Sequence, residues 1–163
     1  MGFYEGKYTP FINWKWKRFG DRTAIEVIDF MGEHPNAEFY IGTDSQNYSR
    51  KGKKYCTFTT CLVAYTLGLG GCAILSSERT ERISNLRQRL MIEAFRSLEV
   101  GWFLNGKIDP AKIITIHLDV NPNLKYKSSK YLPELVGMVA AQGFHCEHKP
   151  HSWAATWAAD KRC

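Results

Sequence analysis

The sequence predicts a single-domain α/β fold in which a five-stranded mixed sheet is flanked by helices. Two observations support this prediction: three strand-like segments follow one another directly, and helix-like and strand-like segments then alternate to the end of the chain. Consecutive strands favour antiparallel pairing, and strands separated by helices favour parallel pairing, so three antiparallel strands should precede the parallel ones. A length of 163 residues suits one domain.

The first half of the chain is expected to supply one helix and three strands. Residues 1–20 are aromatic and basic without a clear period, and we expect them to form an arm packed on the domain. Strand segments are recognised by β-branched and aromatic residues between polar or glycine-rich turns. The expected elements are a helix over 21–33 and strands over 37–43, 54–66 and 72–76, with turns over 45–53 and 67–71.

The second half alternates helices and strands. Asn105-Gly106 and Gly143 are typical helix ends, and Pro150 is placed to open a helix. The expected elements are a long helix over 83–104, a strand over 113–118, a helix over 128–142, a short strand over 144–147 and a final Ala-rich helix after Pro150.

Four acidic residues stand at the ends of these elements or on the helices between them. Asp44 closes the apolar run 38–43, Asp119 closes the run 113–118, Glu93 lies in the long helix and Asp160 in the last one. Converging carboxylates repel each other unless divalent cations bind there. We therefore expect a site for two Mg²⁺ or Mn²⁺ ions, which would hold the attacking water and the leaving oxygen of a phosphodiester. Taken singly, Asp44 and Asp119 could be turn residues, and Asp160 could form a surface ion pair.

Helical geometry selects Glu93 among the acids of the long helix. At about 100° per residue, Glu93 lies at the edge of the apolar stripe, whereas Glu81 and Glu99 are expected to face solvent. Arg87 is placed on the inward side, where it could contact a phosphate or pair with an acid. The stripe consists of Ile83, Leu86, Leu90, Ala94 and Leu98.

The net charge of +6 is concentrated in three segments, 15–18, 50–54 and 125–130. Such groups suit a partner with several phosphates. The segment 13–19 alternates aromatic and basic residues, which could stack on bases or simply anchor the arm. The candidate substrate-binding residues are Ser45, Gln46, Arg87, Lys125, Lys127 and Lys149.

Two histidines are candidates for supporting roles. His117 alternates onto the same strand face as Asp119 and is either a supporting residue of the site or a satisfied core histidine. His151 precedes the final helix and could assist proton transfer. Walker, GxGxxG and serine-hydrolase elbow motifs are lacking in the sequence.

The cysteines and the apolar segments bear on the compartment. Five cysteines without a CxxC pair argue against a disulfide framework or a zinc site. No apolar stretch reaches the ~18 residues of a membrane span, and the first residues lack the apolar core of a signal peptide. We expect a cytoplasmic protein with no membrane partner.

Several segments together resemble the YkuK-type ribonuclease H-like family. The resemblance runs from about residue 21 to the end and rests on Tyr40-Ile-Gly-Thr-Asp-Ser-Gln46, Leu90-Met-Ile-Glu-Ala-Phe-Arg-Ser-Leu98, His117-Leu-Asp119, Glu134-Leu-Val-Gly-Met-Val139, Gly143-Phe144, Lys149-Pro-His-Ser-Trp-Ala-Ala155 and Ala159-Asp-Lys161. It implies that the first and fourth strands are parallel neighbours, so that Asp44 and Asp119 lie side by side. By position, Asp44, Asp119 and Asp160 match the first-strand, fourth-strand and final-helix acids of a divalent-metal nuclease.

Two features depart from the pattern of that family. Glu93 lies further along its helix than the helix Glu of classical ribonucleases H, and Asn121-Pro-Asn123 replaces a glycine-richer turn. The expected function is a metal-dependent nuclease acting on RNA, RNA–DNA hybrid or branched DNA. Two alternatives stay open at this point: a non-catalytic nucleic-acid-binding module of the same fold, and a structural subunit that associates through its Trp-rich ends.

Overall fold

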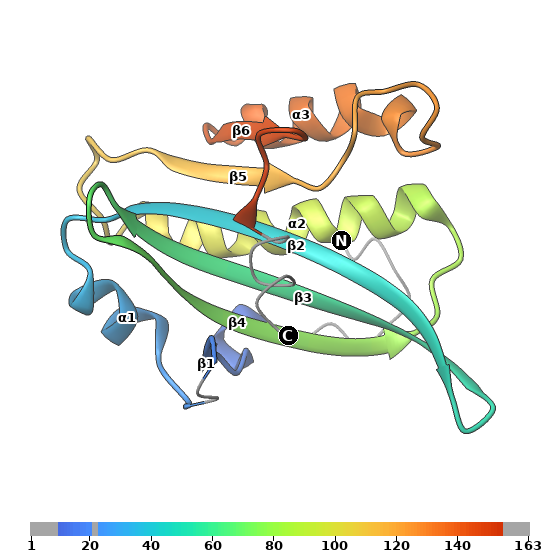
Figure 1. Ribbon diagram of the computed structural model, residues 1–163, viewed down its shortest axis with the longest axis horizontal. Coiled ribbons are helices and arrows are strands. Elements are labelled where there is room, and N and C mark those ends of the chain that lie inside the picture. Colours follow the sequence, from blue (N-terminus) through green and yellow to red (C-terminus); the bar gives the residue numbers. More distant parts are fainter. Residues whose placement is uncertain (1–9, 21–22, 155–163) are drawn as a thin grey trace.

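A mixed sheet of six strands forms the centre of the computed structural model, which describes residues 10–20 and 23–154 (Figure 1). Its strand order is β1-β4-β3-β2-β5-β6. Strands β2, β3 and β4 pair antiparallel, whereas β5 pairs parallel with β2 and with β6. The predicted mixed α/β architecture is confirmed. The strands are β1 (Lys17–Arg18), β2 (Glu38–Arg50), β3 (Lys53–Thr66), β4 (Gly70–Glu81), β5 (Ile114–Leu118) and β6 (His145–His148).

The sixth strand comes from the N-terminal arm, for which the sequence predicted no strand. After the short helix η1 (Phe11–Asn13), strand β1 pairs with β4 at its edge. Trp14 and Trp16 are buried in the main core. Of the two roles considered for these aromatic residues, the structure shows the anchoring one.

Strand β2 is longer than predicted, and this changes the position of Asp44. The sequence indicated a strand over 37–43 and a polar turn over 45–53, but β2 continues to Arg50 and only Lys51 and Gly52 form the turn. The polar segment stays extended because β3 pairs with it along its whole length and satisfies its backbone groups. Lys51 and Gly52 both have positive φ, 49° and 75°, as a two-residue hairpin turn requires. The resulting β2–β3 hairpin projects beyond the helices (Figure 1).

Three helices belong to the described part of the chain. They are α1 (Val27–Glu33), α2 (Leu86–Asn105) and α3 (Leu132–Ala141), the last preceded by the short helix η2 (Ser129–Tyr131). Helix α1 begins later than the predicted residue 21, because Ala24 forms a β-bridge with Lys17. No helix in the described ranges is long and apolar enough to span a membrane.

The main core lies between the sheet and the helices. Helix α2 crosses β2, β3 and β5 on one face of the sheet and also contacts α3. Side chains from this face and from the helices form one apolar cluster, which includes Phe30, Ile41, Leu62, Leu98 and Ile116. The opposite face carries a smaller cluster, Cys61, Val63, Ala73 and Ala154. The two faces of β2 and β5 therefore have different environments.

Candidate active site

Asp44 and Asp119 lie level with each other on the same face of the sheet. The parallel pairing of β2 with β5 ends at Gly42 and His117, and each aspartate follows two residues later. Because side chains alternate along a strand, the aspartates share the face of Gly42 and His117. Asp119 directly follows β5, as predicted. Asp44, expected at a strand end, lies instead within β2, at the point where β5 stops beside it.

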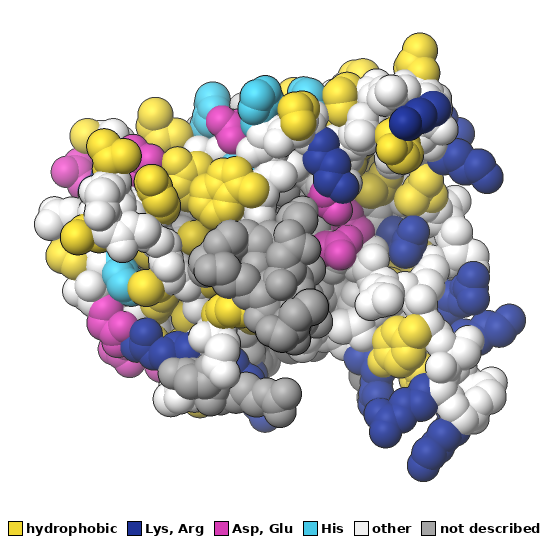
Figure 2. Space-filling model, in the orientation of Figure 1, with side chains coloured by type: hydrophobic (Ala, Val, Ile, Leu, Met, Phe, Trp, Pro, Cys, Tyr) yellow, Lys and Arg dark blue, Asp and Glu magenta, His cyan; other side chains and the backbone are white. Residues whose placement is uncertain are grey.

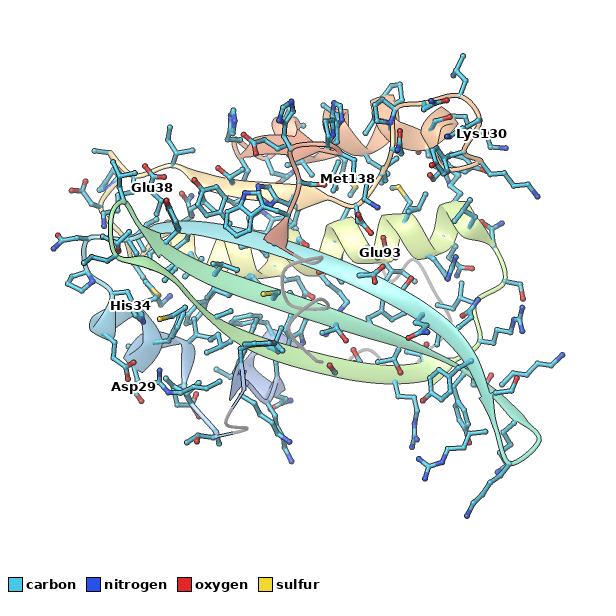
Figure 3. All side chains as sticks on the ribbon, viewed as in Figure 1. Asp29, His34, Glu38, Glu93, Lys130 and Met138 are labelled. Atoms are coloured by element: carbon cyan, nitrogen blue, oxygen red, sulfur yellow. The ribbon has the colours of Figure 1, made fainter. Side chains whose placement is uncertain are left out.

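Glu93 approaches the same place from the other side of the sheet. It projects from α2 into the space between this helix and the sheet (Figure 3), and it is only 8% exposed. The hydroxyl of Ser45 donates a hydrogen bond to Glu93 Oε1 at 2.5 Å. One turn further along α2, Ser97 Oγ lies 2.8 Å from Thr43 Oγ1. Alternation along β2 thus directs Thr43 and Ser45 to the helix and Asp44 to the opposite face.

The three acids are coupled electrostatically. Desolvation raises the pKa of Asp44, and the charge of Asp119 raises it further, while the Ser45 N–H, Lys149 and Arg89 lower it. Burial raises the pKa of Glu93 to about 8; the hydrogen bond from Ser45 opposes this, and the charges of Asp44 and Asp119 add to it. A bound divalent cation would relieve this repulsion.

Two cations border the acids. Lys149 Nζ lies 2.6 Å from Asp119 Oδ1. Arg89 precedes Glu93 by four residues on α2, and its charge lowers the pKa values of Asp44 and Glu93. Arg89 was missed in the sequence, although a spacing of four residues places it on the same helical face as Glu93.

Two other residues of α2 lie elsewhere than predicted. Arg87, expected on the inward face, is exposed and forms an ion pair with Glu134 of α3, which is the second of the two roles that the sequence left open. Its distance of six residues from Glu93 places it on another side of the helix. Glu99, expected to face solvent, is buried, and burial raises its pKa to about 7.

The donor chemistry of the acids suits a hard cation. Carboxylate oxygens from Asp44, Glu93 and Asp119 are the ligands that Mg²⁺ and Mn²⁺ prefer. In the part of the chain that the structure describes, no group of three or more His, Cys, Asp and Glu side chains is arranged closely enough to hold a metal ion. The fourth predicted ligand, Asp160, lies outside the described residues.

His117 is a buried histidine of the sheet. It is 2% exposed, and its Nδ1 accepts hydrogen bonds from the backbone N–H groups of Trp153 at 3.2 Å and Ala154 at 3.0 Å. Its Nε2 lies 3.2 Å from Glu147. Burial lowers the pKa of His117, so the neutral ring holds the chain at Ala154 against the face that carries Asp44. His151 is exposed, and its role in proton transfer stays a prediction.

The predicted substrate-binding residues on the surface fall into separate groups. Gln46 is exposed on the Asp44 face, whereas Ser45 is bonded to Glu93. Lys125 and Lys127 are exposed in a loop that the Asn121 and Asn123 side chains order through hydrogen bonds to backbone N–H groups.

Figure 2 shows where the basic segments lie on the surface. One group of basic side chains covers the β2–β3 hairpin and another lies near the loop before α3, with acidic side chains at the surface to their left. The third basic segment, 15–18, includes the edge strand β1, which β4 and β3 separate from β2. There Arg18 pairs with Glu33. Only two of the three basic segments thus lie at the end of the molecule that holds the acids.

The chain matches a known protein family. The family model described as Ribonuclease H-like matches residues 23–163, which is most of the chain. A search of curated proteins found no match. The matched range includes Asp44, Glu93, Asp119 and Asp160, and it begins after the N-terminal arm.

Proposed function

We propose that this chain, which belongs to the ribonuclease H-like family, is a divalent-metal-dependent nuclease that hydrolyses phosphodiester bonds in RNA, RNA–DNA hybrid or branched DNA. Membership of the family indicates a function related to nucleic acid. The observation that supports the finer proposal is the placement of three coupled carboxylates around the end of β5, where Asp44 and Asp119 lie level on one face and Glu93 approaches from α2.

The proposed roles follow from these positions. Asp44, Asp119 and Glu93, with Asp160, would hold Mg²⁺ or Mn²⁺, which when bound supplies positive charge at the scissile phosphate. Lys149 and Arg89 are placed to contact phosphate oxygens. Ser45 keeps Glu93 oriented through its hydrogen bond. Gln46, Lys125 and Lys127 are exposed and can contact the substrate outside the acids.

A cleavage assay tests the proposal. Labelled single-stranded RNA, RNA–DNA hybrid, duplex DNA and a branched junction would each be incubated with Mg²⁺, Mn²⁺ or EDTA. We expect metal-dependent cleavage that Asp44→Asn reduces at least 100-fold, because the substitution removes a charge from the site. Asp29→Asn is the matched control, since Asp29 is exposed on α1, far from Glu93 (Figure 3). Full activity of Asp44→Asn would refute the proposed site.

One observation favours a second candidate, a non-catalytic nucleic-acid-binding module. Lys149 already neutralises Asp119 through their ion pair. Such a module would bind nucleic acid with a steep salt dependence and would cleave nothing with any divalent ion. A structural subunit, the third hypothesis, would not bind nucleic acid at all.

We also propose that the protein works in the cytoplasm. The four described cysteines, Cys56, Cys61, Cys72 and Cys146, are all free thiols, as is usual in a reducing compartment.

A further inference from the structure

The face of the β2–β3 hairpin that continues from Asp44 carries a distinctive set of side chains. Alternation along β2 places Gln46, Tyr48 and Arg50 on the Asp44 face. Their partners across the ladder share this face, because directly opposite residues point the same way. We call this surface the hairpin track; it consists of Gln46, Tyr48, Arg50, Lys53, Tyr55, Thr57, Arg79 and one acid, Glu81, which lies opposite Tyr55.

The two faces of the hairpin differ in burial. On the helix side, Cys56 and Phe58 are buried against Ile83 and Ile92. On the hairpin track every residue is exposed or partly exposed, and no described element covers it. In Figure 2 basic side chains surround this end of the molecule. In the described part of the chain the track is therefore an uncovered surface. It continues along the strand that carries Asp44.

The track combines aromatic rings with cations. The ring centroids of Tyr48 and Tyr55 are 5.6 Å apart, and Arg79 Cζ lies 4.9 Å from the centre of the Tyr55 ring. A cross-strand aromatic pair alone would stabilise a hairpin. Arg50 and Lys53, however, lie directly opposite each other, and like charges in this position are destabilising. Their placement is explained if an anion binds between them.

We infer that the hairpin track binds the single-stranded stretch of nucleic acid that adjoins the cleaved bond. Base faces can stack on the tyrosines only where the strand is unpaired, and the cations can contact its phosphates. Asp44 and Arg50 are six residues apart, or about 20 Å at ~3.4 Å per residue of an antiparallel strand. Stacked nucleotides also rise ~3.4 Å each, so the track accommodates about six nucleotides. This inference rests on the proposed nuclease function, which supplies the cleaved bond, but binding to the track can be tested separately.

The test measures binding in EDTA, where metal-dependent cleavage cannot occur. Fluorescein-labelled single-stranded RNA and DNA of 3, 6 and 12 nucleotides, and a 12-base-pair duplex, would be titrated by fluorescence anisotropy at two salt concentrations. The variants are Arg50→Glu, Tyr55→Ala and Tyr55→Phe. Lys54→Glu is the matched control, because Lys54 pairs with Ser49 and thus lies on the other face of the hairpin. Thermal melting of each variant verifies that it is folded.

The expected results distinguish the two faces. Arg50→Glu should weaken single-strand binding at least tenfold and reduce its salt slope, whereas Lys54→Glu should change the affinity less than threefold. Tyr55→Ala should weaken it fivefold or more, and Tyr55→Phe, which keeps the ring, should restore it. Affinity should rise steeply from 3 to 6 nucleotides. Equal losses in Arg50→Glu and Lys54→Glu, tighter binding of the duplex than of the single strand, or no binding at all would overturn the inference.

Parallel cleavage assays separate this inference from the proposed function. Single-strand binding that depends on Arg50 and Tyr55, without metal-dependent cleavage, would support the track and refute the nuclease. Cleavage that needs Asp44 but is insensitive to Arg50→Glu and Tyr55→Ala would support the nuclease and refute the track.

Discussion

Lys149 shows how single residues compensate for the charge gathered around the end of β5. Its ammonium group lies 2.6 Å from Asp119, and its charge also lowers the pKa of Asp44. Lys149 directly follows β6, and its backbone N–H donates to Val120, so the strand beside β5 fixes its position. A divalent ion would have to compete with this lysine for Asp119.

The first prediction concerns this competition. We expect Lys149→Gln to bind Mn²⁺ several-fold more tightly, because no ammonium group has to leave Asp119. The KM for nucleic acid should rise at the same time, since a phosphate contact is lost. Mn²⁺ titration followed by calorimetry and steady-state cleavage would measure the two effects. Weaker Mn²⁺ binding in Lys149→Gln would contradict the competition, and Lys17→Gln, at an exposed position of the edge strand β1, serves as the control for a change of charge alone.

At the scale of elements, the position of α2 on the sheet decides whether Glu93 can approach Asp44. Besides Thr43 and Ser45, an ion pair between Arg96 and Glu78 of β4 holds the helix on the sheet, and Arg96 Cζ lies 3.9 Å from the centre of the Trp14 ring. On another side, Gly101 permits close contact with Phe144, because a Cβ at this position would lie 2.9 Å from the Phe144 ring.

Gly101 and Gly137 offer a matched pair of substitutions. Gly101→Ala should lower the free energy of unfolding by about 1–3 kcal/mol, because overpacking against Phe144 outweighs the better helix propensity of alanine. Gly137→Ala in α3 should raise it by about 0.5–1 kcal/mol, since a Cβ there meets no atom within 4 Å. Urea denaturation of both variants would measure the difference. A gain in stability for Gly101→Ala would show that the Phe144 ring can move aside.

Glu99 makes the stability contributed by α2 depend on pH. Its pKa is raised from 4.5 to about 7 by burial, so the folded protein keeps a proton that the unfolded chain releases above pH 4.5. The free energy of unfolding that this proton contributes below pH 4.5, about 3 kcal/mol, is therefore lost as the pH rises to 7 and above. Glu99→Gln does not titrate and should lose less stability over this range. Urea denaturation of the wild type and of Glu99→Gln at pH 5 and pH 8 measures this loss of stability. Equal losses in the two proteins would contradict the prediction.

At the scale of the whole molecule, the sheet joins two regions with different tasks. The N-terminal arm closes the core at one edge through β1 and the buried Trp14 and Trp16. The β2–β3 hairpin extends from the same sheet and exposes its cations instead. Both segments combine aromatic and basic residues, yet burial assigns the first to stability and leaves the second available to a partner.

This contrast predicts the effect of removing a tryptophan from the arm. Trp16→Ala should reduce the free energy of unfolding by about 3–5 kcal/mol, because it leaves a cavity in the core. Trp102→Ala, at an exposed position of α2, should cost about 1 kcal/mol. Urea denaturation and nucleic-acid titration of the folded variants would separate the roles. A large loss of binding with unchanged stability in Trp16→Ala would instead assign Trp16 to base stacking.

Periodicity, turn residues and motif resemblance predicted the order of elements and the mixed sheet, because these depend on local patterns of apolar, β-branched and glycine residues. The same patterns selected Asp44, Asp119 and Glu93, and the structure places these three acids near the end of β5, with Glu93 on the helix side of the sheet and Asp44 on the other. Their role as metal ligands stays a prediction. The length of β2 could not be predicted, because its polar second half is held extended by pairing with β3 and not by burial of its own side chains.

By itself the sequence determined the order of the elements, the candidate acids of the site and the basic segments, since each depends on residues that are close together in the chain. Only the tertiary structure decided that Asp44 lies within a strand beside the end of β5, that Arg89 rather than Arg87 lies close to the acids, and that Glu99 is buried. The register between β2 and β5 and the rotation of α2 about its axis set these positions. Both are fixed by packing between residues far apart in the chain, which no local pattern records.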